Sequence, residues 1–215
     1  MKEYDQESLT ELPTTTAFKY LGTTIDQEGG CGKEVTKRIA KAWDRWRELT
    51  GVLCDRKIPT NLKVLWYKTA IRPTLIYGNE IWPITQQQEN RISATEMRML
   101  RYIHEIKWEE HITNDEVREM AKQEAIAVGM RRRRLQWYGH VQRRDREEDI
   151  RMVAEMRVQG KRKRGRPKKR WCDTLNDDMK RWGLQEDDTD DRGRWHSLIE
   201  LGALRDRHPN RTTAD

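Results

Sequence analysis

The stretch VTKRIAKAWDRWRELT, residues 35–50, decides the fold class of this chain. Its apolar side chains recur at intervals of three and four residues, at Val35, Ile39, Ala42, Trp43 and Trp46. That spacing gathers them on one face of an α-helix. Gly51 follows, and glycine is favoured close to a helix end. The stretch therefore predicts an amphipathic helix with one apolar face.

Two further helical patterns follow this one. Thr60 caps the second, which reaches Pro73, where the proline ring should kink or restart the helix. Thr85 opens the third, and its apolar positions extend to Ile103. Together, residues 33–106 predict a three-helix bundle.

The sequence upstream of this bundle contains a strand signal. Residues 1–17 are mostly polar and are expected to be a lead-in. The run FKYLGTTI, residues 18–25, is rich in aromatic and β-branched side chains, which favour a strand. We expect a hairpin over residues 18–32 that turns within residues 26–32, where Gly29 and Gly30 stand.

The sequence downstream of the bundle predicts small helical segments joined by an extended linker. Residues 107–158 form a basic helical region with a short helix capped at Thr113 and a longer one from about Val128. Residues 159–170 are a basic linker, and residues 171–202 carry the last helices, the first of which should end at Gly183. Residues 203–215 are polar and are expected to be a disordered tail. The predicted fold class is mainly α with a short N-terminal hairpin.

Positive charge is concentrated in one part of the chain. The net charge is +7, but residues 128–170 contain 17 Lys or Arg and 5 Asp or Glu, a net of +12, so the rest carries −5. A basic block on a mildly acidic body indicates a polyanionic partner, DNA or RNA. The alternative is a solvated charged face.

The segment KRKRGRPKKR, residues 161–170, is the sharpest local signal. Its core, RGRP at 164–167, is similar to an AT-hook, in which arginines enter a narrow A·T minor groove. The flanking cations would contact phosphates. A nuclear import signal and a plain solvated linker remain alternatives. The residues predicted to contact nucleic acid here are Lys161, Arg162, Lys163, Arg164, Arg166, Lys168, Lys169 and Arg170.

A second basic feature lies in the longer helix of the basic helical region, residues 107–158. The run Arg131, Arg132, Arg133 and Arg134 goes round most of a helix, so at least one or two of these side chains should face outward and contact phosphates. The run WYGH at 137–140 follows, and its aromatic rings either stack on bases or belong to the core.

Catalytic and metal-binding patterns are weak. Asp177 and Asp178 are adjacent, but they stand in a helical pattern, where we expect a surface position rather than a two-metal centre. The five His and three Cys show no zinc-ligand spacing, and an odd number of Cys favours free thiols in a reducing compartment. No stretch approaches the length of a membrane span, and the N-terminus does not resemble a secretory signal.

Five blocks in fixed order resemble the region after the catalytic motif in reverse transcriptases of LINE-type (non-LTR) retrotransposons, especially RTE-like elements. These blocks are FKYLG (18–22), IRPTLIYGNEIW (71–82), MRMLR (97–101), RRLQWYGHV (133–141) and KRGRPKKRW (163–171). The match runs from about residue 18 to about residue 200. Asn79 and Ile81 depart from the family pattern without changing its helical character.

The resemblance implies a primer-grip hairpin at 18–22, a thumb at 33–106 and a nucleic-acid-binding tail at 128–182. In the hairpin, Lys19 and Tyr20 would contact nucleic acid. The family's catalytic carboxylates and their Mg²⁺ lie in a palm upstream of Phe18, so no cofactor is expected in this chain. The chain is then expected to be a truncated copy and not an enzyme on its own, with the palm as a further partner and the nucleus as its location.

Two functions from different classes therefore stand after the sequence. The first is a non-catalytic nucleic-acid-binding fragment of a retrotransposon reverse transcriptase. The second is a host-used chromatin or protein-interaction protein that keeps the AT-hook-like linker.

Overall fold

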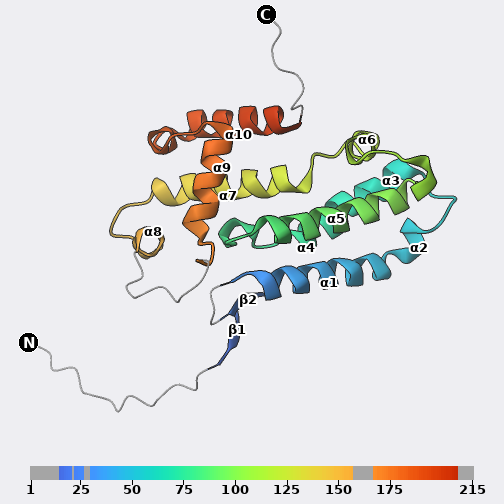
Figure 1. Ribbon diagram of the computed structural model, residues 1–215, viewed down its shortest axis with the longest axis horizontal. Helices are drawn as coiled ribbons and strands as arrows, with labels where there is room; N and C mark the ends of the chain where they lie inside the picture. Colours follow the sequence, from blue (N-terminus) through green and yellow to red (C-terminus); the bar gives the residue numbers. More distant parts are fainter. Residues whose placement is uncertain (1–14, 21, 27–29, 157–166, 208–215) are drawn as a thin grey trace, which may run out of the picture.

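The computed structural model describes residues 15–20, 22–26, 30–156 and 167–207. It is mainly helical with a short N-terminal hairpin, which confirms the predicted fold class (Figure 1). The elements are β1 (Ala17–Tyr20), β2 (Thr23–Asp26), α1 (Gly32–Glu48), α2 (Thr50–Leu53), α3 (Thr60–Trp66), η1 (Tyr67–Ile71), α4 (Arg72–Leu75), η2 (Asn79–Ile81), α5 (Gln86–Ile103), η3 (Trp108–Glu110), α6 (Asn114–Met120), α7 (Ile126–Gln142), α8 (Asp149–Glu155), α9 (Trp171–Trp182), η4 (Glu186–Thr189) and α10 (Arg192–Arg207).

The hairpin turns earlier than the sequence predicts. Strands β1 and β2 pair antiparallel, with Ala17 opposite Asp26 and Tyr20 opposite Thr23. The run 18–25 that we expected to form one arm is therefore divided between both arms, and the expected turn within 26–32 is wrong. The reason is Gly22, whose φ of +81° suits a tight reversal that glycine adopts without steric cost.

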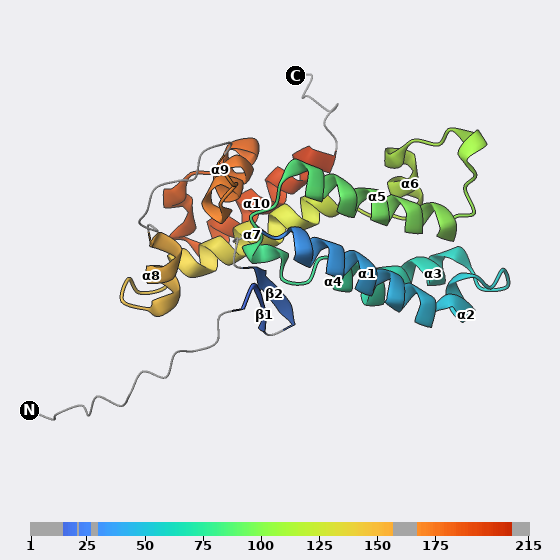
Figure 2. The same cartoon turned by 60° about the horizontal axis from the view of Figure 1, so that its bottom comes forward.

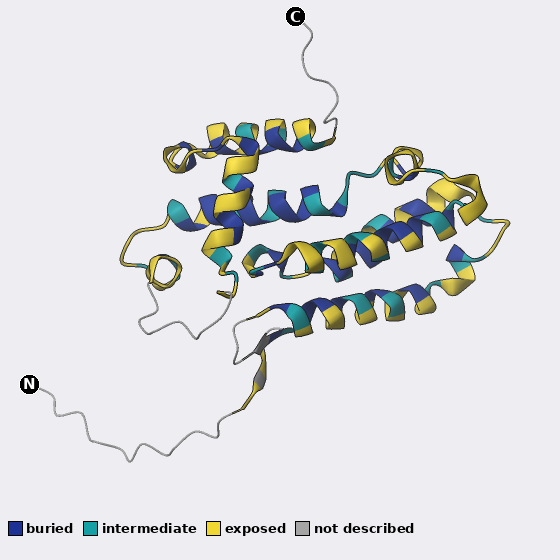
Figure 3. Ribbon diagram, viewed as in Figure 1, coloured by how far each residue is buried: buried dark blue, intermediate teal, exposed yellow. Residues whose placement is uncertain are grey.

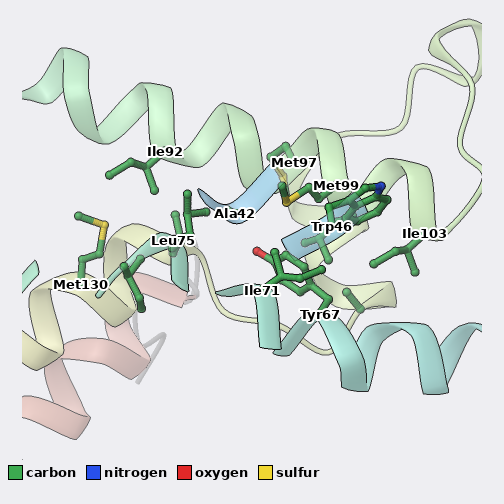
Figure 4. Packing of buried hydrophobic residues seen from close by; sticks show 14 of the residues in the cluster. Ala42, Trp46, Tyr67, Ile71, Leu75, Ile92, Met97, Met99, Ile103 and Met130 are labelled. Carbon is green, nitrogen blue, oxygen red and sulfur yellow. The ribbon is translucent and has the colours of Figure 1, made fainter. Parts of the chain in front are cut away.

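The predicted bundle is present, and it forms the first of two apolar clusters among the described residues. Helices α1 and α5 and the run α3–η1–α4 pack together, and their contact buries Tyr67, Ile71, Leu75 and Ile92 (Figure 4). Helix α7 also contributes, because Met130 is fully buried in the same cluster. The bundle therefore continues past residue 106 into the basic helical region, residues 107–158.

Proline 73 restarts the helix in the middle of this bundle, as predicted. The backbone passes from α3 into the π-helical turn η1, and α4 begins at Arg72 with Pro73 in its first turn. Proline has no amide hydrogen, so it is tolerated in a first turn, where that hydrogen would have no partner within the helix. The π-helical turn η1 precedes the proline, and the chain continues as helix from η1 into α4.

The start of α7 is held by a buried carboxylate from the bundle. Ala125 precedes α7 and offers no capping side chain, but the Ile126 amide donates to Glu96 Oε2 at 3.0 Å. The Tyr67 hydroxyl donates to Glu96 Oε1 at 3.2 Å, and Arg72 Nε lies 3.6 Å from the same oxygen. Burial raises the pKa of the Glu96 carboxyl, while Arg72 opposes the shift. Glu96 thus joins α5 to α7.

The second cluster is formed by α7, α9 and α10. Helix α10 lies along α7, while α9 crosses them both, as the views in Figures 1 and 2 show. Leu135, Trp182, Trp195 and Ile199 are buried between the three helices. Because α7 supplies residues to both clusters, most of its length is buried (Figure 3).

The last helix is longer than predicted. We expected a helix ending near residue 201 and a disordered tail from 203, but α10 continues to Arg207. Ala203 is fully buried, and Asp206 accepts hydrogen bonds from Arg131, Arg181 and Trp182. These contacts fix a final turn that looks polar in the sequence. Of the predicted tail, residues 208–215 lie outside the described part of the chain.

Over the residues that the structure describes, no helix combines the length and the apolar character needed to cross a bilayer.

Candidate nucleic-acid interface

The centre of residues 161–170, called the basic segment from here on, lies outside the described residues. Lys161, Arg162, Lys163, Arg164 and Arg166 all fall in the range 157–166. In the sequence, the basic segment comes between α8 and α9. Its predicted contacts with nucleic acid therefore stay predictions.

The helix before the basic segment is anchored to the end of α7. The Arg151 guanidinium donates to the backbone carbonyls of Gln142 and Arg144, the latter at 3.0 Å. Its Nε also donates to Glu155 at 2.9 Å within α8. This arrangement holds α8 against the C-terminal end of α7.

The last residues of the segment lead directly into α9. Lys168 and Arg170 are exposed, whereas Lys169 Nζ lies 2.7 Å from Asp177 Oδ2. The Asp173 carboxylate accepts a hydrogen bond from the Arg170 amide at 2.8 Å, which closes the first turn of the helix. Lys169 is thus partly neutralised within the chain, and all three side chains lie at or near the surface.

The four consecutive arginines are mostly engaged inside the protein. Arg131 and Arg134 are buried against α9, and Arg132 is bound between Glu124 and Glu200. Arg133 is the most exposed of the four, at 41%, with its Nη1 3.9 Å from Glu80. The guanidinium groups of Arg131, Arg132 and Arg134 are therefore bound to carboxylates of the protein. Of the four arginines, Arg133 is the one that stays accessible for the predicted phosphate contacts.

A buried carboxylate explains this orientation. Asp178 lies on α9 and accepts from Arg131 Nε at 2.8 Å and from Arg134 Nε at 2.6 Å. Its side chain is 6% exposed. The surface position that we expected for Asp178 is therefore wrong, although the neighbouring Asp177 is exposed as predicted. The two carboxylates point to different environments because α9 turns by about 100° per residue.

Two more acidic residues extend this network. Asp206 accepts from Arg131 Nη1 at 2.7 Å, and Glu124 forms two hydrogen bonds with Arg132 and one with Arg207. Burial raises the pKa of Glu124, but the hydrogen bonds from the two arginines outweigh it, so the pKa is lowered overall. The basic block is thus partly neutralised by carboxylates that are distant in the sequence.

The aromatic residues of the same helix divide between core and surface. Tyr138 is buried, and its hydroxyl donates to Glu186 at 3.0 Å. Trp137 is half-buried and stacks on the exposed His140, with ring centroids 5.5 Å apart and planes at 29°. Of the two predicted roles, Tyr138 has the core role, whereas the Trp137–His140 pair stays accessible at the surface.

The predicted primer-grip hairpin is fixed to α1 through residues that the sequence analysis did not single out. Glu34 Oε2 accepts from the Thr24 amide at 2.8 Å, and Arg38 Nη2 donates to the Gly22 carbonyl at 2.7 Å. Glu34 and Arg38 also form a buried ion pair at 2.6 Å. Lys19 is exposed on β1, while the side chain of Tyr20 lies outside the described atoms. The i,i+4 spacing of Glu34 and Arg38 was the available signal.

Gly139 gives the second cluster its close helix contact. The Trp195 indole lies against Gly139, and its Nε1 donates to the Leu135 carbonyl at 3.0 Å. A methyl group on residue 139 would overlap Nε1 and Cδ1 of that ring. Trp195 is buried and hydrogen-bonded, so a shift of its ring would break the bond to the Leu135 carbonyl.

We therefore expect Gly139→Ala to lower the free energy of unfolding by about 1–3 kcal/mol, the usual cost of overpacking. The normal effect of Gly→Ala inside a helix is the opposite, a gain of about 0.5–1 kcal/mol. Gly51→Ala is the control, because a methyl group there meets no atom within 4 Å. Urea denaturation measures both variants, and equal stability of the two would contradict this packing.

Within the part of the chain that the structure describes, no group of three or more His, Cys, Asp or Glu is placed to hold a metal ion. The three cysteines, 31, 54 and 172, are free. Cys31 is buried, and its burial raises the pKa of its thiol to about 11.

Comparison with known proteins gives one informative relative. No family model matches the chain, and no solved structure matches it. A protein of Caenorhabditis elegans, described as transposon-derived and uncharacterized, is 27% identical to the chain over 180 residues. The match covers 80% of this chain and 63% of that protein, so the chain spans less than two thirds of its relative's length. The chain is thus related to a transposon-derived protein.

Proposed function

We propose that this chain is the nucleic-acid-binding part of a LINE-type retrotransposon reverse transcriptase, without catalysis of its own. It combines a primer-grip hairpin, a helical thumb and a basic tail. The observation that carries the proposal is the segment 161–170, in which eight of ten residues are Lys or Arg and none is acidic. The relation to a transposon-derived protein supports an origin of the chain in a transposable element.

The distribution of carboxylates favours this segment as the main contact. Most of the charge in the four-arginine run is neutralised by Asp178, Asp206 and Glu124. At the described end of the basic segment, Lys169 pairs with Asp177. The segment contains no acidic residue of its own. Cations that bind phosphates release counterions from nucleic acid, which produces affinity with a steep salt dependence.

The proposal is tested by binding to labelled nucleic acids over a salt series. An RNA–DNA hybrid, a mixed-sequence DNA duplex and an A·T-rich duplex would each be titrated with the purified chain. We expect all three to bind, with affinity falling steeply as salt rises and the hybrid bound at least as well as either duplex. Absence of binding at physiological salt would overturn the proposal.

A host-used chromatin protein is the second candidate, and the RGRP core at 164–167 favours it. Arginines are preferred to lysines in narrow minor grooves, so a preference for the A·T-rich duplex is its expected signature. The double variant Arg164→Lys/Arg166→Lys keeps the charge. It should abolish that preference if the core acts as an AT-hook, and should change little if the segment contacts only phosphates. The same segment would serve nuclear import in either case.

A further inference from the structure

A cleft between α7 and α10 carries positive charge that the proposed function does not use. It has a volume of about 640 Å³, and it lies where the end of α7 meets the start of α10. It is lined by Gln136, His140, Arg143, Arg144, Arg192, Trp195, His196 and Ile199. Three of these residues are arginines and two are histidines, and none is acidic.

The two helices place these residues on facing stripes. Gln136, His140 and Arg143 follow each other at intervals of three and four residues on α7, so they share one face. Arg192, His196 and Ile199 do the same on α10. The Trp195 indole forms the floor, because it is buried and bonded to the Leu135 carbonyl of α7. The walls of the cleft are therefore formed by the two helices and by the turn after α7, which carries Arg143 and Arg144.

The arginines of the cleft differ in what holds them. Arg143 Nη1 donates to the Thr189 carbonyl at 2.9 Å, a neutral partner that leaves its charge uncompensated. Arg144 Nη1 is 3.6 Å from Glu148, in a pair where both side chains are about half exposed, so water screens the attraction. Arg192 is exposed at the first residue of α10. The lining of the cleft thus carries three arginines and no carboxylate, a combination that suits a phosphate group.

An aromatic surface adjoins this charge. His140 lines the cleft and stacks on Trp137, as described above. A nucleobase stacks well on such rings, but only where it is not already stacked within a duplex. Phosphate-binding cations beside an accessible ring pair are the combination found in sites for single strands.

We propose that the α7–α10 cleft binds an unpaired nucleic-acid strand, with a backbone phosphate at Arg144 and Arg192 and a base against His140. This inference rests on the proposed function and names a second contact for the same ligand. The cleft lies at the C-terminal end of α7, and α8 is held at that same end (Figure 1). Because the basic segment follows α8 in the sequence, one nucleic acid would contact both. The basic segment would hold the duplex, and the cleft would take a single-stranded extension.

The test compares a blunt duplex with the same duplex carrying a single-stranded overhang. The variant Arg144→Ala/Arg192→Ala changes two exposed residues of the cleft, and Arg56→Ala/Arg205→Ala removes the same charge from exposed positions elsewhere. We expect the unmodified chain and the control to bind the overhang duplex about tenfold more tightly than the blunt one. The cleft variant should lose this increment, and its salt slope should fall by about 0.7 for each phosphate contact removed.

A second arm isolates the base contact. His140→Ala should weaken binding of the overhang duplex by roughly fivefold or more, the usual loss of one stacked base. An abasic overhang should bind the unmodified chain and His140→Ala equally. If His140→Ala weakens binding of the abasic overhang as much as it weakens binding of the normal overhang, the stacking contact is overturned.

The outcomes separate this inference from the proposed function. If the blunt duplex binds but the overhang adds nothing, or if the cleft variant keeps the increment, the cleft inference fails and the proposed function stands. If no nucleic acid binds, both fail together. If inorganic phosphate competes for the cleft while the overhang does not bind there, the cleft is a small-anion site and the inference is overturned.

Discussion

Replacement of Asp178 by alanine is expected to lower the free energy of unfolding by about 3–5 kcal/mol, which is the usual effect of removing one partner of a buried ion pair. The Arg134 side chain is fully buried, and Asp178 is the carboxylate that pairs with it among the described residues, at 2.6 Å. Its two terminal nitrogens have no hydrogen-bond acceptor among the described protein atoms. Without Asp178, the charge of Arg134 stays buried and unpaired, so folding becomes less favourable.

The adjacent residue supplies the control for this experiment. Asp177 is exposed and pairs with Lys169 at the surface, where such pairs contribute about 0–1 kcal/mol. Urea denaturation of Asp177→Ala and Asp178→Ala compares the same chemical change at neighbouring positions. Similar losses in the two variants would contradict the buried position of Asp178.

A further pair of variants separates charge burial from packing. Arg134→Met should lower the free energy of unfolding by less than Asp178→Ala. In Arg134→Met, Asp178 still pairs with Arg131, whereas in Asp178→Ala no other carboxylate among the described residues pairs with Arg134. The combined change Arg134→Met/Asp178→Leu should recover part of the loss, since apolar replacements of a whole buried pair are often tolerated.

The local signals of the sequence predicted much of the fold. The capping residues Thr85 and Thr113 begin helices as expected, each with a complete capping box. Gly183 ends α9 with a φ of +68°. These features depend on neighbours within a few residues, which is why the sequence alone reveals them.

Features that depend on distant partners were not predictable in this way. The orientation of Arg134 follows from Asp178, which lies 44 residues away, and no local pattern pairs the two. The last turn of α10 likewise forms because Asp206 meets Arg131 from α7. A polar residue of this kind looks solvent-exposed in the sequence, and only the tertiary contact shows that it is buried.

The hairpin shows a different cause of error. The run at 18–25 has the composition of a single strand, and the pair of glycines at 29 and 30 offered a stronger turn signal than Gly22. The contacts from Glu34 and Arg38 on α1 hold the earlier turn in place. Here the tertiary contacts and the positive φ of Gly22 decide between two turns that composition does not separate.

The second large effect is expected from the basic segment. Changing Lys161, Arg162, Lys163, Arg164 and Arg166 to alanine should weaken duplex binding by about 100-fold or more at physiological salt. The slope of log affinity against log salt should fall by about 0.9 for each phosphate contact that is lost. Lys169 and Arg170 are kept, because they contact Asp177 and the first turn of α9.

A control variant with the same net charge shows whether position or total charge matters. It carries alanine at five exposed cations elsewhere: Lys41, Arg56, Lys57, Lys180 and Arg205. Each variant loses five positive charges, so the net charge of each falls from +7 to +2. Long-range attraction therefore changes equally, and only specific contacts differ between the two.

The most direct test of the nucleic-acid-binding account is the salt slope of duplex binding for these two variants, measured beside the unmodified chain. The account predicts that the segment variant loses both affinity and slope, while the control keeps a slope close to that of the unmodified chain. Equal slopes in the two variants, or a segment variant that binds as tightly as the unmodified chain, would contradict the account and leave residues 161–170 as a linker or import signal.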